Sequence, residues 1–152
     1  MQQKRIRVRA IILHDKKIIS MYREMGDRKF YTFPGGGVEK DETEQECVIR
    51  EVYEEFGIII KPIKKVYVYE NKISVEHFYV CEWNDGSFGT GNGEEFQIQN
   101  TNGVYIPLFL NIMDIPNLPL MPPEVASEFY KDYLSNGDYL RDDIKYLTEI
   151  NK

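Results

Sequence analysis

The sequence predicts an α+β fold, in which strands lead, one helix is embedded among them, and further strands and helices follow. Apolar residues alternate with polar ones near the amino terminus and again in the middle of the chain, as in strands that bury one face. Between these segments, residues 43–57 place apolar and acidic side chains on separate faces of a helix. With 152 residues and 42% hydrophobic side chains, the chain can bury a sizeable core, and we expect one domain spanning residues 1–152.

The first two strands are expected to form a hairpin. Residues 5–13 place apolar side chains at every second position before becoming continuously apolar: Ile6, Val8, Ala10 and Ile12. Residues 14–17 are a polar turn, and residues 18–23 return as the second arm. A short aromatic strand over residues 30–33 then leads to the glycines at 35–37.

Local signals mark both ends of the embedded helix. Thr43 is expected to be the N-cap, because Glu46 three residues later completes a capping box. Gly57 is expected to end the helix in the left-handed conformation that glycine adopts readily. The helix between these residues is therefore predicted with defined limits.

Strands are predicted again beyond the helix. Two β-rich runs lie at Lys64–Tyr69 and Ser74–Trp83, and shorter strands are expected at residues 94–99 and 104–108. Residues 111–123 contain four prolines and are expected to be a connection.

The carboxyl-terminal part of the chain is predicted to be helical. A second helix is expected from about Pro123 to Leu134, with Asn136 and Gly137 ending it. Residues 138–150 show an amphipathic pattern and are predicted to form a last helix.

Three carboxylates of the embedded helix share one stripe. At about 100° per residue, Glu54 and Glu55 project within about 60° and 40° of Glu51, so the stripe is about 100° wide. Like charges at this spacing cost about 0.2–0.5 kcal/mol per pair, and a bound cation removes that cost. Three oxygen ligands on one rigid element suit a hard ion such as Mg²⁺, which shares its coordination shell with phosphates.

The spacing of these residues matches a known motif. Between residues 36 and 58 the chain resembles the Nudix box at each of nine specified positions. The matching residues are Gly36, Glu42, Arg50, Glu51, Val52, Glu54, Glu55, Gly57 and Ile58. The chain is thus similar to the Nudix (MutT-like) hydrolases. The resemblance implies the Nudix fold, a mixed β-sheet sandwiched between α-helices.

The resemblance also implies an activity. Nudix hydrolases cleave a phosphoanhydride bond of a nucleoside diphosphate linked to another group, with Mg²⁺ or Mn²⁺ as the cofactor. In the family, the glutamates matching Glu51, Glu54 and Glu55 bind the metal, and the carbonyl matching Gly35 often completes its shell. The position matching Glu51 has in some members also been given the role of general base.

Supporting roles follow from the same resemblance. The family pairs the residues that match Glu42 and Arg50, and this pair orients the loop against the helix. Gly36 and Gly37, together with Gly35, are expected to permit positive φ angles and a close approach of the backbone to phosphate.

A further carboxylate is expected from outside the box. Many Nudix hydrolases draw one from a downstream loop, and the best candidates here are Glu94 and Glu95, directly after the glycine-rich residues 84–93. Glu82 and Glu76 compete for this role, but both lie inside a predicted strand. We expect Glu51, Glu54 and Glu95 to be the catalytic residues, with Glu94 near the substrate.

Nucleoside contacts are expected upstream of the box. Arg23, Phe30 and Tyr31 lie where the family tends to contact the nucleoside, and an aromatic face can stack on a base. Packing in the core is the alternative interpretation for each aromatic residue.

Three functions fit the resemblance. The leading one is a pyrophosphohydrolase of nucleoside triphosphates, including modified ones. The second is a pyrophosphatase of ADP-ribose or another nucleotide sugar. The third is a catalytically inactive Nudix domain that binds a nucleotide or acts as a regulatory module. ADP-ribose hydrolases often carry a proline shortly after the box, and here no proline occurs between Ile63 and Ile106. This difference favours the first function.

Composition narrows the class of partner. A net charge of −6 argues against general binding to nucleic-acid polymers. No apolar stretch approaches the roughly 20 residues that cross a bilayer, and the amino terminus lacks the apolar core of a signal peptide. We therefore expect a cytoplasmic protein that binds a small nucleotide and no membrane. A homodimer is compatible with the sequence.

Overall fold

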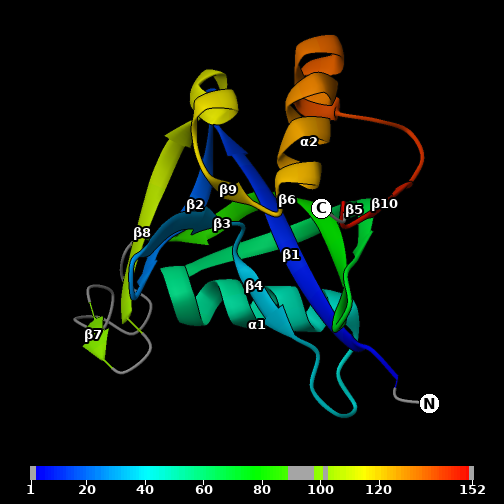
Figure 1. Ribbon diagram of the computed structural model, residues 1–152. Helices are drawn as coiled ribbons and strands as arrows, with labels where there is room; N and C mark the ends of the chain where they lie inside the picture. The colour runs from blue at the N-terminus through cyan, green and yellow to red at the C-terminus, as the bar shows by residue number, and fades with distance from the viewer. Residues whose placement is uncertain (1–2, 89–97, 101–102, 151–152) are drawn as a thin grey trace.

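The computed structural model describes residues 3–88, 98–100 and 103–150 and has the predicted α+β architecture (Figure 1). In this part of the chain, helix α1 (Glu44–Phe56) and helix α2 (Pro123–Asn136) lie on opposite faces of a mixed β-sheet. None of the described helices is long and apolar enough to cross a membrane.

The sheet has the strand order β10-β5-β6-β1-β2-β3-β9, with β4 added to β1, β8 to β2 and β7 to β8. The first five strands are β1 (Arg5–His14), β2 (Lys17–Met25), β3 (Arg28–Thr32), β4 (Gly35–Gly37) and β5 (Ile58–Glu70). The remaining strands are β6 (Ser74–Gly86), β7 (Ile98–Asn100), β8 (Gly103–Asn111), β9 (Leu120–Met121) and β10 (Lys145–Thr148).

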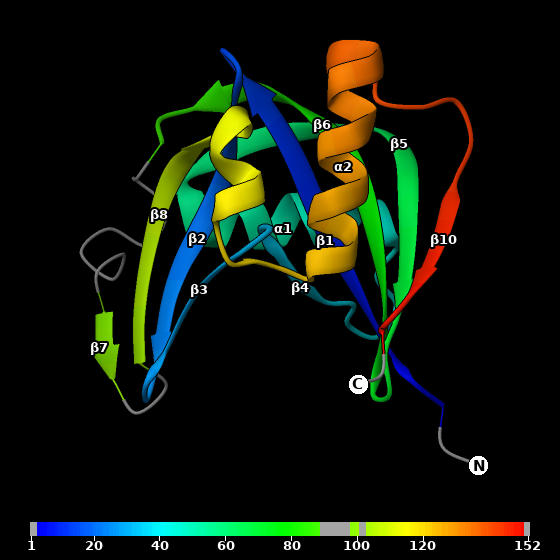
Figure 2. The ribbon, with the colours of Figure 1, turned by 45° about the horizontal axis from the view of Figure 1, so that its top comes forward.

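The sheet is mixed because its central pair, β1 with β6, is parallel, whereas β1 with β2 and β5 with β6 are antiparallel. β1 and β2 pair through Leu13 and Ile18, close to the turn that joins them. Beyond this turn, β2, β3 and β8 lie to one side of β1, and β5, β6 and β10 to the other (Figure 2). β1 is therefore the strand from which both halves of the sheet extend.

The alternation predicted for β1 divides its side chains between two cores. Val8, Ala10 and Ile12 pack on the α1 side, together with the apolar face of that helix. Ile11 points the other way and packs with Phe78 and α2 residues. The ring of Phe33 lies in this second core, edge to face with Phe78 at a centroid distance of 5.3 Å.

The predicted ends of α1 are present in the structure. The Thr43 hydroxyl accepts a hydrogen bond from the Glu46 backbone N–H, and the Glu46 carboxylate accepts one from the Thr43 backbone N–H. Gly57 follows the helix with φ 78° and ψ 9°, the left-handed conformation that costs glycine little. Local sequence therefore sets the length of this helix.

The predicted last helix over residues 138–150 is wrong. The chain instead forms a short 3₁₀ turn, η3 (Gly137–Tyr139), and then strand β10, which pairs parallel with β5 through Lys145 and Tyr67. Leu140 is fully buried with φ 63°, which breaks any continuous helix at that point. The amphipathic pattern did not reveal the open edge of β5, whose backbone groups β10 satisfies.

Several strands are longer than predicted. β5 begins at Ile58, directly after α1, and continues through Pro62. A register shift between Pro62 and Lys64 lets the strand accommodate this proline. β6 continues to Gly86, and β8 covers the strand predicted at residues 104–108. The proline-rich connection contains a 3₁₀ helix, η2 (Ile112–Asn117), and β9.

We predict that Phe129→Ala destabilises the fold by about 3–5 kcal/mol, the usual cost of removing a buried phenylalanine ring. The Phe129 side chain is fully buried and contacts the Phe33 ring at a centroid distance of 6.3 Å. Urea unfolding followed by circular dichroism would measure the change. Leu134→Ala on the same helix is the control, because Leu134 is 56% exposed and its truncation should cost well under 1 kcal/mol. Equal effects of the two substitutions would contradict the prediction.

Candidate functional site

The site is built where the glycine strand β4 runs between β1 and α1 (Figure 1). Gly37 pairs with Arg7, and Gly35 pairs with Arg9, in an antiparallel register. A Cβ atom on Gly36 would lie 2.4 Å from the carboxylate of Glu51. The strand can therefore approach the helix this closely only because it has no side chain at that position.

The expected positive φ angles are found at only one of the three glycines. Gly35 has φ 143°, whereas Gly36 and Gly37 are not among the residues with positive φ and continue as extended strand. Glycine is needed at these two positions because neighbouring side chains leave no room for a Cβ atom. A Cβ atom on Gly37 would lie 2.4 Å from the guanidinium of Arg5.

The carboxyl group of Glu55 lies beneath this strand and is partly buried. One of its oxygens, Oε1, accepts a hydrogen bond from the Gly35 backbone N–H at 3.2 Å. Burial, together with the nearby charge of Glu51, raises the pKa of Glu55 to about 8, while the charge of Arg9 opposes both. This carboxyl group is therefore held where its negative charge is unfavourable.

Glu51 and Glu54 lie on the same side of α1 and share one partner. The Arg50 Nη1 atom donates to Glu51 Oε2 at 3.1 Å and to Glu54 Oε1 at 3.2 Å. Glu51 is half-buried, and burial raises its pKa against the lowering effect of Arg50. Glu54 is exposed. The three carboxylates thus differ in environment, because Glu51 and Glu55 are partly buried and Glu54 is exposed.

Arg50 also fixes the loop that precedes the helix. Its Nε and Nη2 atoms donate to the two carboxylate oxygens of Glu42 at 2.7 and 3.1 Å, and Nη2 donates to the Gly37 carbonyl at 3.4 Å. The hydrogen bond from Arg50 lowers the pKa of Glu42 to about 2. A bidentate pair of this kind restricts both partners, so the loop, β4 and α1 are held together through one guanidinium.

The donor groups suit a hard cation. Carboxylate oxygens of Glu51, Glu54 and Glu55 and the backbone of Gly35 are the ligand types that Mg²⁺ and Mn²⁺ take. Among the residues that the structure describes, no three acidic, histidine or cysteine side chains are already gathered around one point. Arg50 instead lies against two of the carboxylates and neutralises part of their charge.

Three arginines lie beside β4 and were not among the site residues predicted from the sequence. Arg5, Arg7 and Arg9 occupy alternate positions of β1, on the face opposite Val8 and Ala10. Arg9 donates to Glu76 Oε1 at 3.1 Å and to the Phe33 carbonyl at 3.3 Å. The signal was the alternation itself, in which basic residues take every second position of an otherwise apolar strand.

The predicted nucleoside contacts lie on β2 and β3. Arg23 donates to the Tyr105 hydroxyl at 2.7 Å and lies over the Tyr105 ring at 4.4 Å. Phe30, paired with Arg23 across the two strands, is 7% exposed. Tyr31 packs against the core on the α2 side. None of the contacts described for these residues reaches the carboxylates of α1.

The downstream carboxylates Glu94 and Glu95 lie outside the described residues. The structure therefore places neither of them relative to β4 and α1.

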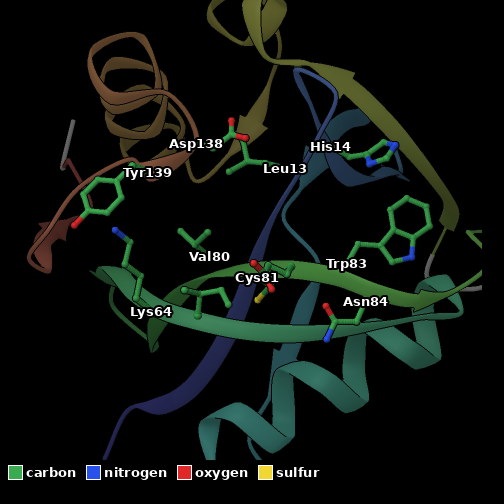
Figure 3. Close-up of a pocket in the computed structure, with 11 residues that line it drawn as sticks. Leu13, His14, Lys64, Val80, Cys81, Trp83, Asn84, Asp138 and Tyr139 are labelled. Atoms are coloured by element: carbon green, nitrogen blue, oxygen red, sulfur yellow. The ribbon is translucent and has the colours of Figure 1, made fainter.

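A cavity of about 580 Å³ lies at the opposite end of β1 from the glycine strand (Figure 3). His14 and Trp83 line one side of it with their rings 5.1 Å apart, and Lys64 lies 3.5 Å from the centre of the Tyr139 ring on the other side. Figure 3 shows these side chains on the face of β5 and β6 that is turned away from α1. The cavity contains none of the carboxylates of the helix.

Comparison with known proteins agrees with this arrangement. The NUDIX domain matches residues 3–106 of the chain. A NUDIX hydrolase from Nitrosomonas europaea is similar in structure, with a TM-score of 0.73 and 18% sequence identity over 100% of this chain and 81% of that one. Among curated proteins, none matches the sequence.

Two further solved structures are similar. An ADP-ribose pyrophosphatase from Streptococcus suis has a TM-score of 0.64 and 19% identity, over 97% of this chain and 100% of that one. A MutT NUDIX hydrolase from Burkholderia pseudomallei also has a TM-score of 0.64, with 21% identity over 84% of this chain and 98% of that one. At these identities the likeness concerns the fold, and it confirms the predicted mixed sheet between helices.

We predict that Glu55→Gln stabilises the protein in the presence of EDTA at pH 7 by about 1–3 kcal/mol, since one pKa unit corresponds to about 1.4 kcal/mol. The pKa of Glu55 is about 8 in the folded chain, above its ordinary value of 4.5. The folded state therefore binds a proton that the unfolded state releases between these two values. Stability from this proton is fully present below pH 4.5 and is lost as the pH rises toward 8.

Urea unfolding at several pH values in EDTA would measure this effect. The wild-type chain should lose stability relative to Glu55→Gln as the pH rises through this window. Glu54→Gln is the control on the same helix, because Glu54 is exposed and its removal relieves no buried charge. Parallel pH profiles for the wild type and Glu55→Gln would show that the Glu55 carboxyl is not held in this environment.

Proposed function

The chain belongs to the Nudix family of hydrolases, which act on small nucleotides, and from this premise we propose that it is a pyrophosphohydrolase of nucleoside triphosphates, unmodified or modified. The reaction cleaves a phosphoanhydride bond with water and yields a nucleoside monophosphate and pyrophosphate. The observation that carries the proposal is the partly buried carboxyl of Glu55 beside Glu51, under a strand that has no side chains.

This environment favours a bound divalent cation. Two carboxylates that are close together and partly shielded from water repel one another, and this repulsion adds to burial in raising the pKa of Glu55. We propose that Glu51, Glu54, Glu55 and the Gly35 carbonyl hold Mg²⁺ or Mn²⁺. When bound, such an ion neutralises phosphate oxygens and lowers the pKa of a coordinated water.

The remaining residues have distinct proposed roles. Glu42 and Arg50 keep the loop against α1, and the hydrogen bonds of Arg50 to Glu51 and Glu54 orient these carboxylates. Gly36 and Gly37 let the backbone come close to the phosphate chain. Glu51 is the proposed general base within the box.

Residues beyond the box complete the proposed site. Glu95, with Glu94 beside it, is the alternative source of the base. Arg23, Phe30 and Tyr31 are the proposed nucleoside contacts. The pairing of Arg23 with Tyr105 leaves a planar cation over an aromatic ring, an arrangement on which a base can stack.

A triphosphate suits this site better than ADP-ribose. The chain carries a net charge of −6 and repels polyanions at long range. Affinity must therefore come from cation bridges to the phosphates and from stacking on the base. A triphosphate offers more oxygens for bridging, and the proline common in ADP-ribose hydrolases is absent between Ile63 and Ile106.

We predict that hydrolysis requires a divalent cation and falls at least about 100-fold in Glu54→Gln, because a charged ligand is lost. Product release measured with Mg²⁺, and again with excess EDTA, would test both parts. Glu149→Gln is the control, since Glu149 is an exposed carboxylate that follows β10, outside the site. Full activity in excess EDTA would overturn the metal requirement.

We also predict a preference among substrates. The specificity constant kcat/KM should be higher for nucleoside triphosphates than for ADP-ribose, for the reasons of charge and bridging given above. A panel of unmodified and oxidised triphosphates with ADP-ribose, assayed with Mg²⁺ and Mn²⁺ and with the products identified, would measure it. A tenfold or larger preference for ADP-ribose would replace the proposed substrate.

A further inference from the structure

The arginines of β1 form a row on one face of the sheet. Arg5, Arg7 and Arg9 alternate with residues that pack toward α1, so their side chains all project toward the other face. Ile11, the next residue on that face, lies in the core under α2. The row therefore occupies the part of this face that the core leaves open, at the amino-terminal end of β1.

The three side chains differ in how they are satisfied. Arg9 has two acceptors, Glu76 Oε1 and the Phe33 carbonyl. The guanidinium of Arg5 lies over Gly37, where a Cβ atom would be only 2.4 Å from it. Arg7 stands between them, half-buried, and its side chain makes no hydrogen bond or ion pair with any residue that the structure describes.

This arrangement is unfavourable for Arg7 without a further partner. Burial lowers the pKa of Arg7, and the positive charges of Arg9 and Arg5 lower it further, while Glu76 and Glu51 act in the opposite direction. An arginine stays charged in a protein all the same, and its guanidinium presents five N–H donors. A partly desolvated cation that has two cationic neighbours, and whose N–H donors have no acceptor among the described residues, is a site for an anion.

The row adjoins the carboxylates of the helix. Arg7 pairs with Gly37 across β1 and β4, and Gly36, the next residue of β4, lies against Glu51. Figure 1 shows this end of β1 beside β4. Acidic groups suited to a cation and basic groups suited to an anion thus meet along one short glycine strand. A polyphosphate chain fits this succession, with some oxygens neutralised through a cation and others contacted directly by arginine.

We propose that Arg7, with Arg5 beside it, binds the terminal phosphate of a nucleoside triphosphate directly. The terminal phosphate is the one farthest from the nucleoside. This inference rests on the proposed function and adds a residue that determines which substrates are preferred. A terminal phosphate has three free oxygens and carries up to two negative charges, so a guanidinium can bind it through two parallel hydrogen bonds. ADP-ribose has no terminal phosphate and cannot form this contact.

Steady-state kinetics of Arg7 variants would test the proposal. In Arg7→Gln, the KM for a nucleoside triphosphate should rise at least about tenfold, as expected when a bidentate contact to a charged group is lost. The KM for ADP-ribose should change less than about threefold. Arg7→Lys keeps the positive charge but loses the planar guanidinium that can form two parallel hydrogen bonds. Its KM for the triphosphate should therefore lie between those of the wild type and Arg7→Gln. Lys131→Gln, which removes an exposed cation from α2, should leave both KM values unchanged.

A binding measurement separates this inference from the activity. Calorimetric titration with inorganic tripolyphosphate in EDTA should give at least about tenfold weaker binding to Arg7→Gln than to wild type, and higher salt should reduce that difference. Equal tripolyphosphate affinity in the two proteins, or an equal rise of the KM for triphosphate and ADP-ribose, would overturn the role of Arg7. Failure of the wild type to hydrolyse any triphosphate would overturn the proposed function, and the tripolyphosphate titration would still decide whether Arg7 binds terminal phosphates.

Discussion

The close packing of the glycine strand β4 on helix α1 is the constraint on which the site depends. Gly36 leaves less room than a Cβ atom would need beside the Glu51 carboxylate, and the Gly35 N–H is bonded to Glu55. A side chain at Gly36 would push the strand away from the helix and expose Glu55 further. The raised pKa of Glu55 and the short distance between β4 and α1 both depend on this contact.

Charges around this contact are arranged in layers. Glu51, Glu54 and Glu55 lie on the helix side, and the arginines of β1 lie on the far face of the sheet. The two layers act on each other through charge, because Arg9 opposes the rise in the pKa of Glu55 and Glu51 opposes the fall in the pKa of Arg7. Arg50 stays on the helix side, bonded to Glu42, Glu51 and Glu54. A substrate that is itself polyanionic and binds with a cation would satisfy both layers at once.

The elements that the sequence predicted well are those that depend on near neighbours. The capping box at Thr43, the end of α1 at Gly57 and the alternation of β1 are decided within a few residues. The amphipathic pattern of the segment at 138–150 predicted a helix. The same pattern is also compatible with an edge strand, which is what the segment forms. Its structure depends on pairing with β5, whose partner residues lie 78 positions earlier in the chain, as with Tyr67 and Lys145. No local pattern contains this register.

For the site, the sequence by itself determined which carboxylates share a helix face and which family spacing they follow, because both depend only on helical geometry and chain position. Only the tertiary structure decided that Glu55 has a raised pKa and that Arg50 reaches Glu51 and Glu54 as well as Glu42. It also decided that Arg7 lies beside β4 with no hydrogen-bond or ion-pair partner among the described residues. These properties arise where β1, β4 and α1 meet. Burial and charge at such a meeting point are set by residues far apart in sequence, so no window of the chain could have shown them.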